Sequence, residues 1–457
     1  MIAFIKKLIG DRRGNVLVVV GACLPLIIGA AGLATDTIEW TLWKRQLQRA
    51  ADSAAFAGVY DRASASGATT NTPTAVCRDL AVNLHTWMGL IGTAPCTGGV
   101  GSYTDLQYPA DTALLSNQVQ VTLSIQQRLP FSSMFMSAAP VIQATATAAS
   151  VAAGGNPCAL ALNSTGTAID NSGNATIDAP TCIFYSDSAA SNSAAAGGNS
   201  SVHAKAIAGV GGIAQSNNWD VDQYLPYSPS LPDPYAPPSD TAVTPDPNDM
   251  HCAVTSTTKK GVTTYTPVAL SDGMDITTLK DQDGNPANCF TSLSVGSNRT
   301  LTIPDTYTGP IYINGGDVNF QGTFNCSACT IVLTNKSTSP TATIGTLSSN
   351  AQAHNNITAP TDGDYAGIAV YQDRRATSGT NRINGGADNV IAGVVYFPKE
   401  TLWINGTGTA VSLCTMWIAG NIVFNGTSSI AISSADDEQC SGVDLPQGGT
   451  TIVRLVA

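Results

Sequence analysis

Hydrophobic and polar positions follow three different patterns along the chain, and the first is an uncharged apolar run over residues 14–35. A bilayer core is crossed by a helix of about 20 residues, because lipid offers no partners to unpaired backbone groups. The run therefore predicts a transmembrane helix at 14–35 behind a short tail at 1–13. Arg12 and Trp40 stand beyond its two ends, as the charged and aromatic edges of a span do.

A cleaved signal peptide and a buried core helix are the two alternatives to an anchor. A signal peptide has an apolar region of roughly 7–15 residues that ends in a small-residue cleavage site. The run here is longer, and a helical pattern continues after it, so a retained anchor is favoured. Lys44, Arg45 and Arg49 follow the span closely, so flanking charge alone favours a cytoplasmic N-terminus only weakly.

The second pattern is a helical stripe of apolar and small residues beyond the span. It comprises Ile38, Leu42, Leu47, Ala50, Ala54 and Ala57. We expect this helix to end at Gly58 and the Ser/Gly/Thr-rich stretch 64–72. Pro73 then predicts the start of a second short helix at 74–88.

The third pattern is the alternation of apolar and polar residues that is typical of strands. It runs from Val119 to Ile125, which predicts a half-buried strand, and it returns at 142–148. The loop between these strands gathers four large apolar residues, Phe131, Met134, Phe135 and Met136. Their grouping indicates either a small core under a turn or a loop that touches a membrane or a partner. The whole of 36–152 is thus predicted to be an extracytoplasmic α+β region.

From residue 153 onward, short apolar segments alternate with Gly, Asn, Asp and Ser, and no long amphipathic helix is evident. A proline-rich stretch at 221–250 is typical of an extended linker or a long surface loop. This stretch separates a β-rich region at 153–220 from a larger β domain at 251–457.

The larger β domain contains an internal repeat, in which an apolar residue is followed by Asn-Gly. The repeat occurs at 313–315, 383–385, 404–406 and 424–426. Asn-Gly supplies a turn with positive φ, and the spacing of the last three, about 20 residues, is typical of stacked solenoid rungs. We therefore expect mainly β structure in the form of a parallel β-helix, with a β-sandwich joined by hairpin turns as the alternative.

Composition and charge place most of the chain outside the cytoplasm. Charged residues make up 12% of the chain, about half the ~25% typical of soluble domains. Ala, Ser, Thr, Asn and Gly take their place, as in many secreted and surface β-proteins. The net charge of −11 argues against nucleic acid as a partner.

Cysteine usage indicates the same compartment. Cys23 lies inside the predicted span, and the other ten of the 11 cysteines follow it. An even number outside the membrane indicates disulfides in an oxidising environment, although sequence alone does not settle their connectivity. The simplest pairing joins neighbours along the chain: Cys77 with Cys96, Cys158 with Cys182, Cys252 with Cys289, Cys326 with Cys329, and Cys414 with Cys440.

Candidate chemistry is sparse. Cys326 and Cys329 have the spacing of a redox motif, but strand-like residues follow them, which favours a structural disulfide. The four histidines lack ligand spacing, so we expect no metal and no cofactor. Polysaccharide-cleaving β-helices use clustered carboxylates with a basic residue. The candidates here are Asp362, Asp364, Asp373 with Arg374 and Arg375, and Asp436, Asp437 and Glu438, for which solvated turns are the favoured interpretation.

The N-terminal residues resemble a known family. Arg13, Gly14 and Asn15 precede the apolar run, Pro25 lies within it, Asp36 marks its exit, and Leu47, Gln48, Ala51, Asp52, Ala54 and Ala55 follow. Together these residues resemble the TadE/TadG-like proteins of bacterial Flp pilus assembly. The resemblance is strong over this segment, weaker over the strand pair near 117–148, and does not extend to the rest of the chain.

This resemblance implies a bacterial inner-membrane protein with a cytoplasmic N-terminus and a role in building or anchoring an adhesive pilus. Pilin-like members carry a Gly at a peptidase cut and a Glu five residues later. Val19 stands five residues after Gly14, so the TadG-like branch fits better and the tether is predicted to be permanent. The D-x-S-x-S metal motif found in some TadG-like proteins is absent from the sequence.

Two features of the span bear on partners. Ala30 and Ala34 form a small-xxx-small pair, which allows close approach of another helix in lipid. Pro25 would kink the span or leave a free carbonyl for a partner. Besides the bilayer, we therefore expect other pilus-assembly membrane proteins to contact the anchor.

The sequence predicts a non-enzymatic, membrane-anchored structural protein of Flp/Tad-type pilus assembly, whose β domain contacts pilus or cell-wall components. Two alternatives from other classes stay open. One is a tethered carbohydrate-binding or carbohydrate-cleaving β-helix, and the other is a surface adhesin.

Overall fold

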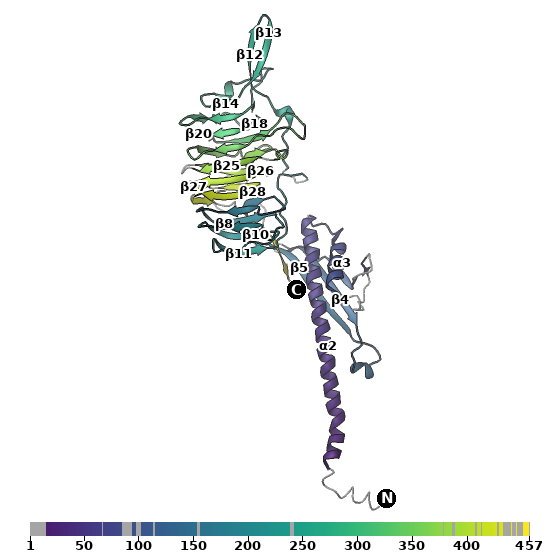
Figure 1. Ribbon diagram of the computed structural model, residues 1–457. Helices are drawn as coiled ribbons and strands as arrows, with labels where there is room; N and C mark the ends of the chain where they lie inside the picture. The colour runs from purple at the N-terminus through teal and green to yellow at the C-terminus, as the bar shows by residue number, and fades with distance from the viewer. Residues whose placement is uncertain are drawn as a thin grey trace, which may run out of the picture. The chain divides into compact units, whose positions relative to one another are not determined.

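The computed structural model describes residues 15–65, 67–84, 94–96, 102–112, 115–152, 156–237, 242–377, 379–385, 389–406, 409–412, 414–426, 429–432, 440, 445 and 451–456. The chain forms two compact units (Figure 1). Unit 1 comprises Met1–Val151 and Val453–Ala457, and unit 2 comprises Ala152–Ile452. Unit 2 is therefore inserted into the chain of unit 1, to which the C-terminal residues return.

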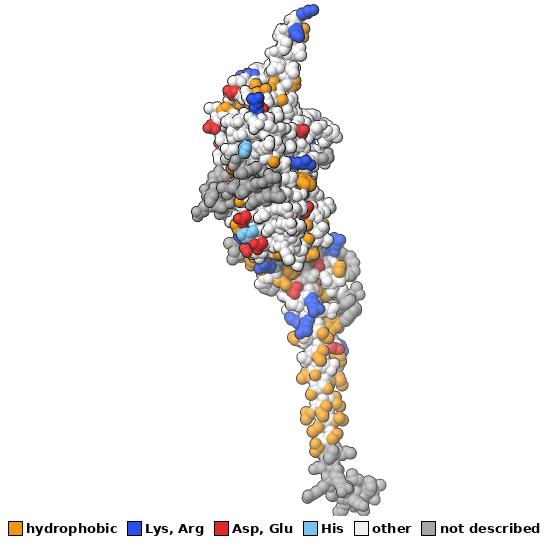
Figure 2. Space-filling model, turned by 60° about the vertical axis from the view of Figure 1, so that its left-hand side comes forward, with side chains coloured by type: hydrophobic (Ala, Val, Ile, Leu, Met, Phe, Trp, Pro, Cys, Tyr) orange, Lys and Arg blue, Asp and Glu red, His pale blue; other side chains and the backbone are white. Residues whose placement is uncertain are grey.

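Unit 1 begins with one long helix, α2 (Asn15–Ser64), which runs uninterrupted through Pro25. Its 50 residues extend about 75 Å at 1.5 Å per residue, whereas a bilayer core is about 30 Å thick. By length and composition it is the one helix among the described residues that is able to cross a membrane. Figure 2 shows hydrophobic side chains along its N-terminal half, and Leu26 there is 74% exposed.

The end of α2 corrects a sequence expectation, because Gly58 lies inside the helix and does not end it. A Cβ at this position would stand 2.7 Å from Val119 Cγ1, so the missing side chain lets α2 approach strand β4 (Leu115–Gln126) closely. The second helix, α3, spans Thr72–Asn83 and so begins and ends earlier than expected. Residues 85–88 of the expected helix lie outside the described part of the chain.

Unit 1 contains a four-stranded sheet in the order β3 (Asp105–Gln107), β4, β5 (Val141–Ala152) and β30 (Thr451–Leu455). β4 pairs in antiparallel fashion with both β3 and β5. The two strands expected from alternation are therefore confirmed, and the C-terminus adds an edge strand that the pattern did not reveal. A separate antiparallel pair joins β1 (Ala94–Pro95) to β2 (Ser102–Tyr103).

The core of unit 1 brings the helical stripe and the alternating strand together. Its buried members include Leu47, Ala50, Ala51, Ala54, Ala55 and Val59 of α2, Val76 and Leu80 of α3, and Val119, Val121, Leu123 and Ile125 of β4. Small residues on α2 allow the helix to lie close against the sheet. Ile38 and Leu42, which belong to the same sequence stripe, are exposed.

Unit 2 consists mainly of strands, and its helical elements include the short turns η3 (Pro247–Asp249) and η4 (Ile276–Thr278). The strands are β6 (Pro157–Ala161), β7 (Ile169–Asn171), β8 (Thr176–Ser186), β9 (Ala194–Ala196), β10 (Ser201–Gly209), β11 (Trp219–Pro226), β12 (Val254–Lys259), β13 (Val262–Pro267), β14 (Leu270–Ser271), β15 (Cys289–Phe290), β16 (Leu293–Val295), β17 (Thr300–Thr302), β18 (Gly309–Asn314), β19 (Val318–Phe320), β20 (Thr323–Cys326), β21 (Cys329–Thr334), β22 (Leu347–Ser349), β23 (His354–Thr358), β24 (Ile368–Gln372), β25 (Thr380–Gly385), β26 (Val390–Gly406), β27 (Thr409–Ser412), β28 (Thr415–Gly426) and β29 (Ser429–Ile432). All but β12 and β13 belong to one 22-stranded sheet.

Strands of this sheet pair in parallel, in several cases with the strand three places further along the chain. β15, β16 and β17 pair with β18, β19 and β20, which pair in turn with β21, β22 and β23. Parallel strands covered on both faces are apolar throughout, and β21 is buried at all 6 positions. Figure 1 shows the resulting layers of arrows.

The stacking order of unit 2 departs from the order of the chain. β28 pairs with β6 and β7, and β29 pairs with β8. In Figure 1 the blue strands β8 and β10 accordingly lie below the yellow strands β27 and β28. The first strands of the unit therefore continue a stack that the last strands complete. The chain has to travel back along this stack between β11 and β14.

Residues 227–250 make this return, and we call them the strap. Tyr235, Val243 and Met250 of the strap are buried against outward-facing residues of the sheet. These outward-facing residues occupy paired positions on successive strands. They include Tyr185, Leu160, Ile418, Tyr396, Tyr371, Val332 and Tyr312. The expectation of a linker or surface loop over 221–250 is wrong at its start, because residues 221–226 belong to β11. The described residues of the strap contain no strand, as its prolines predict, and they pack along the sheet.

Three of the four Asn-Gly repeats lie on top of one another. Ile383, Ile404 and Phe424 occupy equivalent positions on β25, β26 and β28, and the Asn-Gly pairs after them are also in register. The repeat interval is therefore one step across the parallel sheet. The repeat at 313–315 pairs instead with β21, so its likeness to the others lies in local turn chemistry, with Gly315 at φ +79°.

The cysteines form five disulfides among the described residues. They are Cys77–Cys96 in unit 1 and Cys158–Cys182, Cys252–Cys289, Cys326–Cys329 and Cys414–Cys440 in unit 2. The structure thus joins the same chain neighbours that the sequence suggested. Cys23 is free and exposed on α2.

Candidate functional site

The motif residues of the second half of α2 form a packing face. Leu47, Ala51, Ala54 and Ala55 are fully buried in the core of unit 1. Gln48 links this face to the sheet, because its Nε2 donates to Asp52 Oδ1 at 2.8 Å and to the carbonyl of Thr145 on β5 at 3.0 Å. Arg13 and Gly14 lie outside the described residues, and Asn15 begins α2.

Asp36, at the exit of the apolar run, contacts a loop far away in sequence. The loop joins β4 to β5 and contains the turn η2 (Ser132–Met134), and we call residues 129–140 the hairpin tip. The Asp36 side chain is buried, and its Oδ1 accepts the backbone N–H of Phe131 at 2.9 Å. Its Oδ2 accepts both the backbone N–H and the hydroxyl of Ser132. The carboxylate thus holds the first amides of η2 as a capping residue would.

Gly32 completes this junction one helical turn before Asp36. A Cβ on Gly32 would stand 2.2 Å from Cδ2 and 2.4 Å from Cγ of Phe131. The Phe131 ring therefore lies directly on the helix backbone, and any larger residue at position 32 would displace it. Gly32 and Asp36 together fix where the hairpin tip meets α2.

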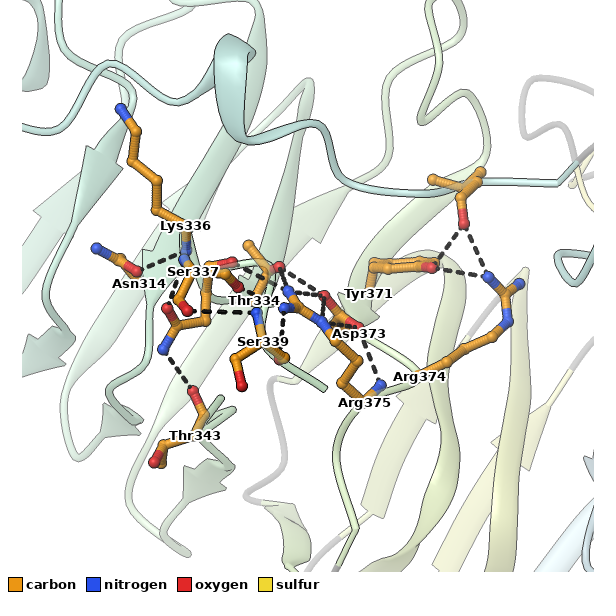
Figure 3. Close-up of polar contacts among 12 residues, drawn as sticks. Asn314, Thr334, Lys336, Ser337, Ser339, Thr343, Tyr371, Asp373, Arg374 and Arg375 are labelled. Carbon is orange, nitrogen blue, oxygen red and sulfur yellow. Dashed lines mark hydrogen bonds and ion pairs between the residues drawn. The ribbon is translucent and has the colours of Figure 1, made fainter. Parts of the chain in front are cut away.

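The candidate charges of unit 2 are used to hold loops. Asp373 and Arg375 form an ion pair of 2.7 Å, and Thr334 donates to Asp373 Oδ2 (Figure 3). Burial opposes the charged form of Asp373, but the hydrogen bonds from Arg375 and Thr334 hold its pKa below the usual value. Arg375 also donates to the carbonyls of Ser337 and Asn335 and so holds the loop after β21 in place.

Arg374 points to the other side and holds the strap. Its Nη1 donates to the carbonyl of Val243 at 2.8 Å, and the Tyr371 hydroxyl donates to the same oxygen (Figure 3). Its guanidinium lies 5.3 Å from the ring centroid of Tyr396, whose hydroxyl donates to Asp233 Oδ2 of the strap. Burial and Asp233 raise the pKa of Tyr396, so this hydroxyl remains a donor.

A groove of about 380 Å³ lies beside this region, between Pro340–Thr346 and the segment that follows Arg375. One carboxylate, Glu400, lines it and is 5% exposed. Glu400 accepts hydrogen bonds from Gln372 Nε2 at 2.8 Å and Asn381 Nδ2 at 3.0 Å. The groove therefore brings together Glu400 and Arg375, while the nearby Asp373 is paired with Arg375 itself.

The other sequence candidates are separate from this groove. Asp362 and Asp364 lie exposed in a turn before β24, and Asp436, Asp437 and Glu438 lie outside the described residues. Cys326 and Cys329 are joined to each other. Across the part of the chain that the structure describes, no group of three or more His, Cys, Asp or Glu side chains is able to hold a metal ion.

Residues 14–66 match the family model described as "Putative Flp pilus-assembly TadE/G-like". The N-terminal segment is TadE/G-like. The match confirms the resemblance, and it ends where α2 ends, so it covers the span, Asp36 and the packing face but none of unit 2. No curated protein and no solved structure matches the chain. The match and the apolar helix indicate a pilus-assembly-related membrane protein. The helix and the disulfides fit a single-pass membrane protein with a domain outside the cytoplasm.

Sequence reasoning missed the partners of the key residues. Asp36 was recognised as a motif residue, but its partner Ser132 lies 96 positions away, and no local signal connects them. Glu400 gave no signal because it stands alone in a strand. The uninterrupted apolar runs in β24 and β26, which lack the polar alternation of a strand with one exposed face, are a signal that indicates a covered outer face.

Proposed function

We propose that this protein is a structural component of Flp/Tad-type pilus assembly, held in the bacterial inner membrane by α2 with its N-terminus in the cytoplasm. The observation that carries the proposal is the continuity of α2. One unbroken helix leads from the apolar run into the core of unit 1, and the TadE/G-like segment covers both parts. Most of the family residues beyond the span are buried, and the half-buried Gln48 is hydrogen-bonded to the sheet, which suits a rigid tether.

The second part of the proposal concerns unit 2, which we interpret as a parallel β-solenoid. Its support is the pairing of strands three places apart and the stacking of the Asn-Gly repeats. Five disulfides across the two units and few charged residues suit an oxidising envelope compartment. Unit 2 would present a rigid surface to pilus or cell-wall components, and the Ala30/Ala34 face of α2 would meet other membrane proteins of the system.

A structural role fits the charged residues better than polysaccharide cleavage. Glycoside hydrolysis needs two free carboxylates at a defined separation. Glu400, which lines the groove of unit 2, is held by amide donors, and the nearby Asp373 is paired with Arg375. Both carboxylates serve as structural acceptors, which supports a non-enzymatic protein.

Gene deletion and complementation test this proposal. We expect deletion to abolish pili and surface attachment, and the full chain to restore both. Leu26→Arg places a charge in the middle of the span, so we expect it to leave the membrane fraction and to fail in complementation, whereas Leu26→Phe should behave like the parent. Protease added outside spheroplasts should digest unit 2 but spare an N-terminal tag. Normal pili in the deletion strain would overturn the proposed role.

A further inference from the structure

The hairpin tip presents an apolar surface next to the predicted membrane exit. Met134 and Phe135 are each 75% exposed, and Met136 is 52% exposed. No residue from Leu129 to Val141 is charged, whereas Arg128 stands exposed at its base. Three adjacent large apolar side chains of this kind mark a surface that contacts something other than water.

Contacts within unit 1 place this surface at the level of the bilayer. Phe131 lies against Gly32, which belongs to the predicted span 14–35, and Ser132 is bound to Asp36 at its end. Gly32 lies about 6 Å below Asp36 along the helix axis, toward the N-terminus. Figure 1 shows the loop between β4 and β5 beside α2, well before the end of the helix at Ser64. If α2 spans the membrane, the hairpin tip reaches the same interface.

The backbone of the hairpin tip is prepared for a medium with little water. The amides of Phe131 and Ser132 donate to Asp36. Those of the next four residues donate to carbonyls of the tip itself, at Leu129 for Ser133, at Phe131 for Met134, and at Ser132 for Phe135 and Met136. Six consecutive N–H groups are thus satisfied without water, which entry into a bilayer requires.

We propose that the hairpin tip inserts into the outer interface of the same bilayer that α2 crosses, with Met134, Phe135 and Met136 among the lipid tails. Asp36 and Gly32 then act as positioning residues, because they fix the tip to the helix and thereby set its depth. The exposed Arg128 would lie at the level of anionic head groups. The protein would hold the membrane at two points, which prevents unit 1 from tilting about a single helix. This inference rests on the anchoring of α2 proposed above.

Depth measurement by spin labelling tests the proposal on the full chain in nanodiscs of phosphatidylcholine and phosphatidylglycerol. In a Cys23→Ser background, single labels are placed at Phe135→Cys, at Leu26→Cys within the span, and at Val82→Cys on α3. Val82 is a matched control, because it is an 82% exposed apolar residue of the same unit and belongs to α3, which Figure 1 shows nearer the C-terminal end of α2 than the loop between β4 and β5. We expect labels at 26 and 135 to be accessible to oxygen and protected from a water-soluble nickel reagent, and the label at 82 to show the opposite.

The outcomes distinguish failure of this inference from failure of the proposed membrane anchor. The inference would be overturned, and the anchor left intact, if the label at 26 were in lipid while the label at 135 was in water. The same conclusion would follow if protein shielded the label at 135 from both reagents. A label at 26 in water would overturn both. Gly32→Leu should displace Phe131 and move the label at 135 toward water, whereas Gly29→Leu, at a position where a Cβ meets no other atom within 4 Å, should not. Met134→Cys provides a second label should Phe135→Cys express poorly.

Discussion

Unit 1 and unit 2 bury apolar surface in different ways. In unit 1 one helix lies on an antiparallel sheet, and the contact is made by small side chains such as Ala51 and Ala55. In unit 2 parallel strands carry large side chains on both faces, such as Phe424 inside and Tyr396 outside. Unit 1 contains the TadE/G-like segment, and the family match includes no residue of unit 2.

This difference indicates the structural role of the family motif. Its residues beyond the span are those that a helix needs in order to approach a sheet closely, together with Asp36, which holds the hairpin tip. In this chain the TadE/G-like segment therefore includes the residues that join the long apolar helix to the folded part of unit 1. Substitutions that act on one unit and not on the other sharpen this comparison.

The largest effect is expected for Phe424→Ala in unit 2. The Phe424 ring is fully buried, with the ring centroids of Trp417 and Phe184 at 5.4 and 5.8 Å. Truncation leaves a cavity at the position where β28 meets β7, so we expect unfolding of unit 2 to become easier by about 3–5 kcal/mol. Chemical denaturation followed by near-ultraviolet circular dichroism measures this. Phe424→Leu should cost clearly less, and equal midpoints for Phe424→Ala and the parent would contradict the assignment of the core.

Asp187 makes the stability of unit 2 dependent on pH. Burial raises the pKa of its carboxyl to about 7, with a smaller contribution from Asp233, and the N–H donated by Leu231 of the strap only partly offsets this. Between about pH 4 and 7 the folded protein keeps a proton that the unfolded chain has lost. The contribution of the protonated Asp187 to the free energy of unfolding is therefore fully present below pH 4 and is lost as the pH rises to 7.

Asp187→Asn removes this titration and keeps an acceptor for Leu231. We expect it to stabilise unit 2 on the order of 2–4 kcal/mol at pH 8 and to change nothing at pH 4. Denaturation of parent and variant at both pH values provides the comparison. Equal gains at pH 4 and pH 8 would show that the ionisation of Asp187 is not the cause.

The corresponding core substitution in unit 1 is Ala51→Leu, which adds volume where α2 lies close to the sheet. Ala51 is fully buried in the core. Ala51→Leu forces α2 away from the sheet, so we expect a loss of about 1–3 kcal/mol confined to unit 1. Hydrogen exchange should show faster exchange in β4 and β5 and unchanged exchange in β21 and β24. Uniform destabilisation of both units would argue against their independence.

The smallest effect is expected at the hairpin of β12 and β13, which is the counterpart of the hairpin tip. Val262 there is 67% exposed, nearly as much as Phe135. The hairpin has no buried contact to lose, so Val262→Ser should change stability by less than about 0.5 kcal/mol. We also expect no change in membrane association, measured by vesicle flotation. A change in flotation would reveal a second lipid contact.

Several local features of this protein can be predicted from its sequence alone. An uncharged run predicts the apolar helix, a stripe of Leu47, Ala50 and Ala54 predicts the packing face, and alternation from Val119 predicts β4. The period of the Asn-Gly repeats predicts one step of the parallel sheet. These features are readable because each depends on residues close together in the chain.

The tertiary structure alone decided which distant segments meet. Nothing near Asp36 indicates Ser132, and nothing in β6 indicates that β28 completes its sheet. The proline-rich stretch predicts a linker or a long surface loop, because prolines indicate missing backbone hydrogen bonds but not what Tyr235 packs against. Parallel pairing leaves the sequence distance between partners free, and the choice of partner depends on side chains on both strands at once. The sequence pattern shows which residues of a segment are apolar, but not which distant segment covers them.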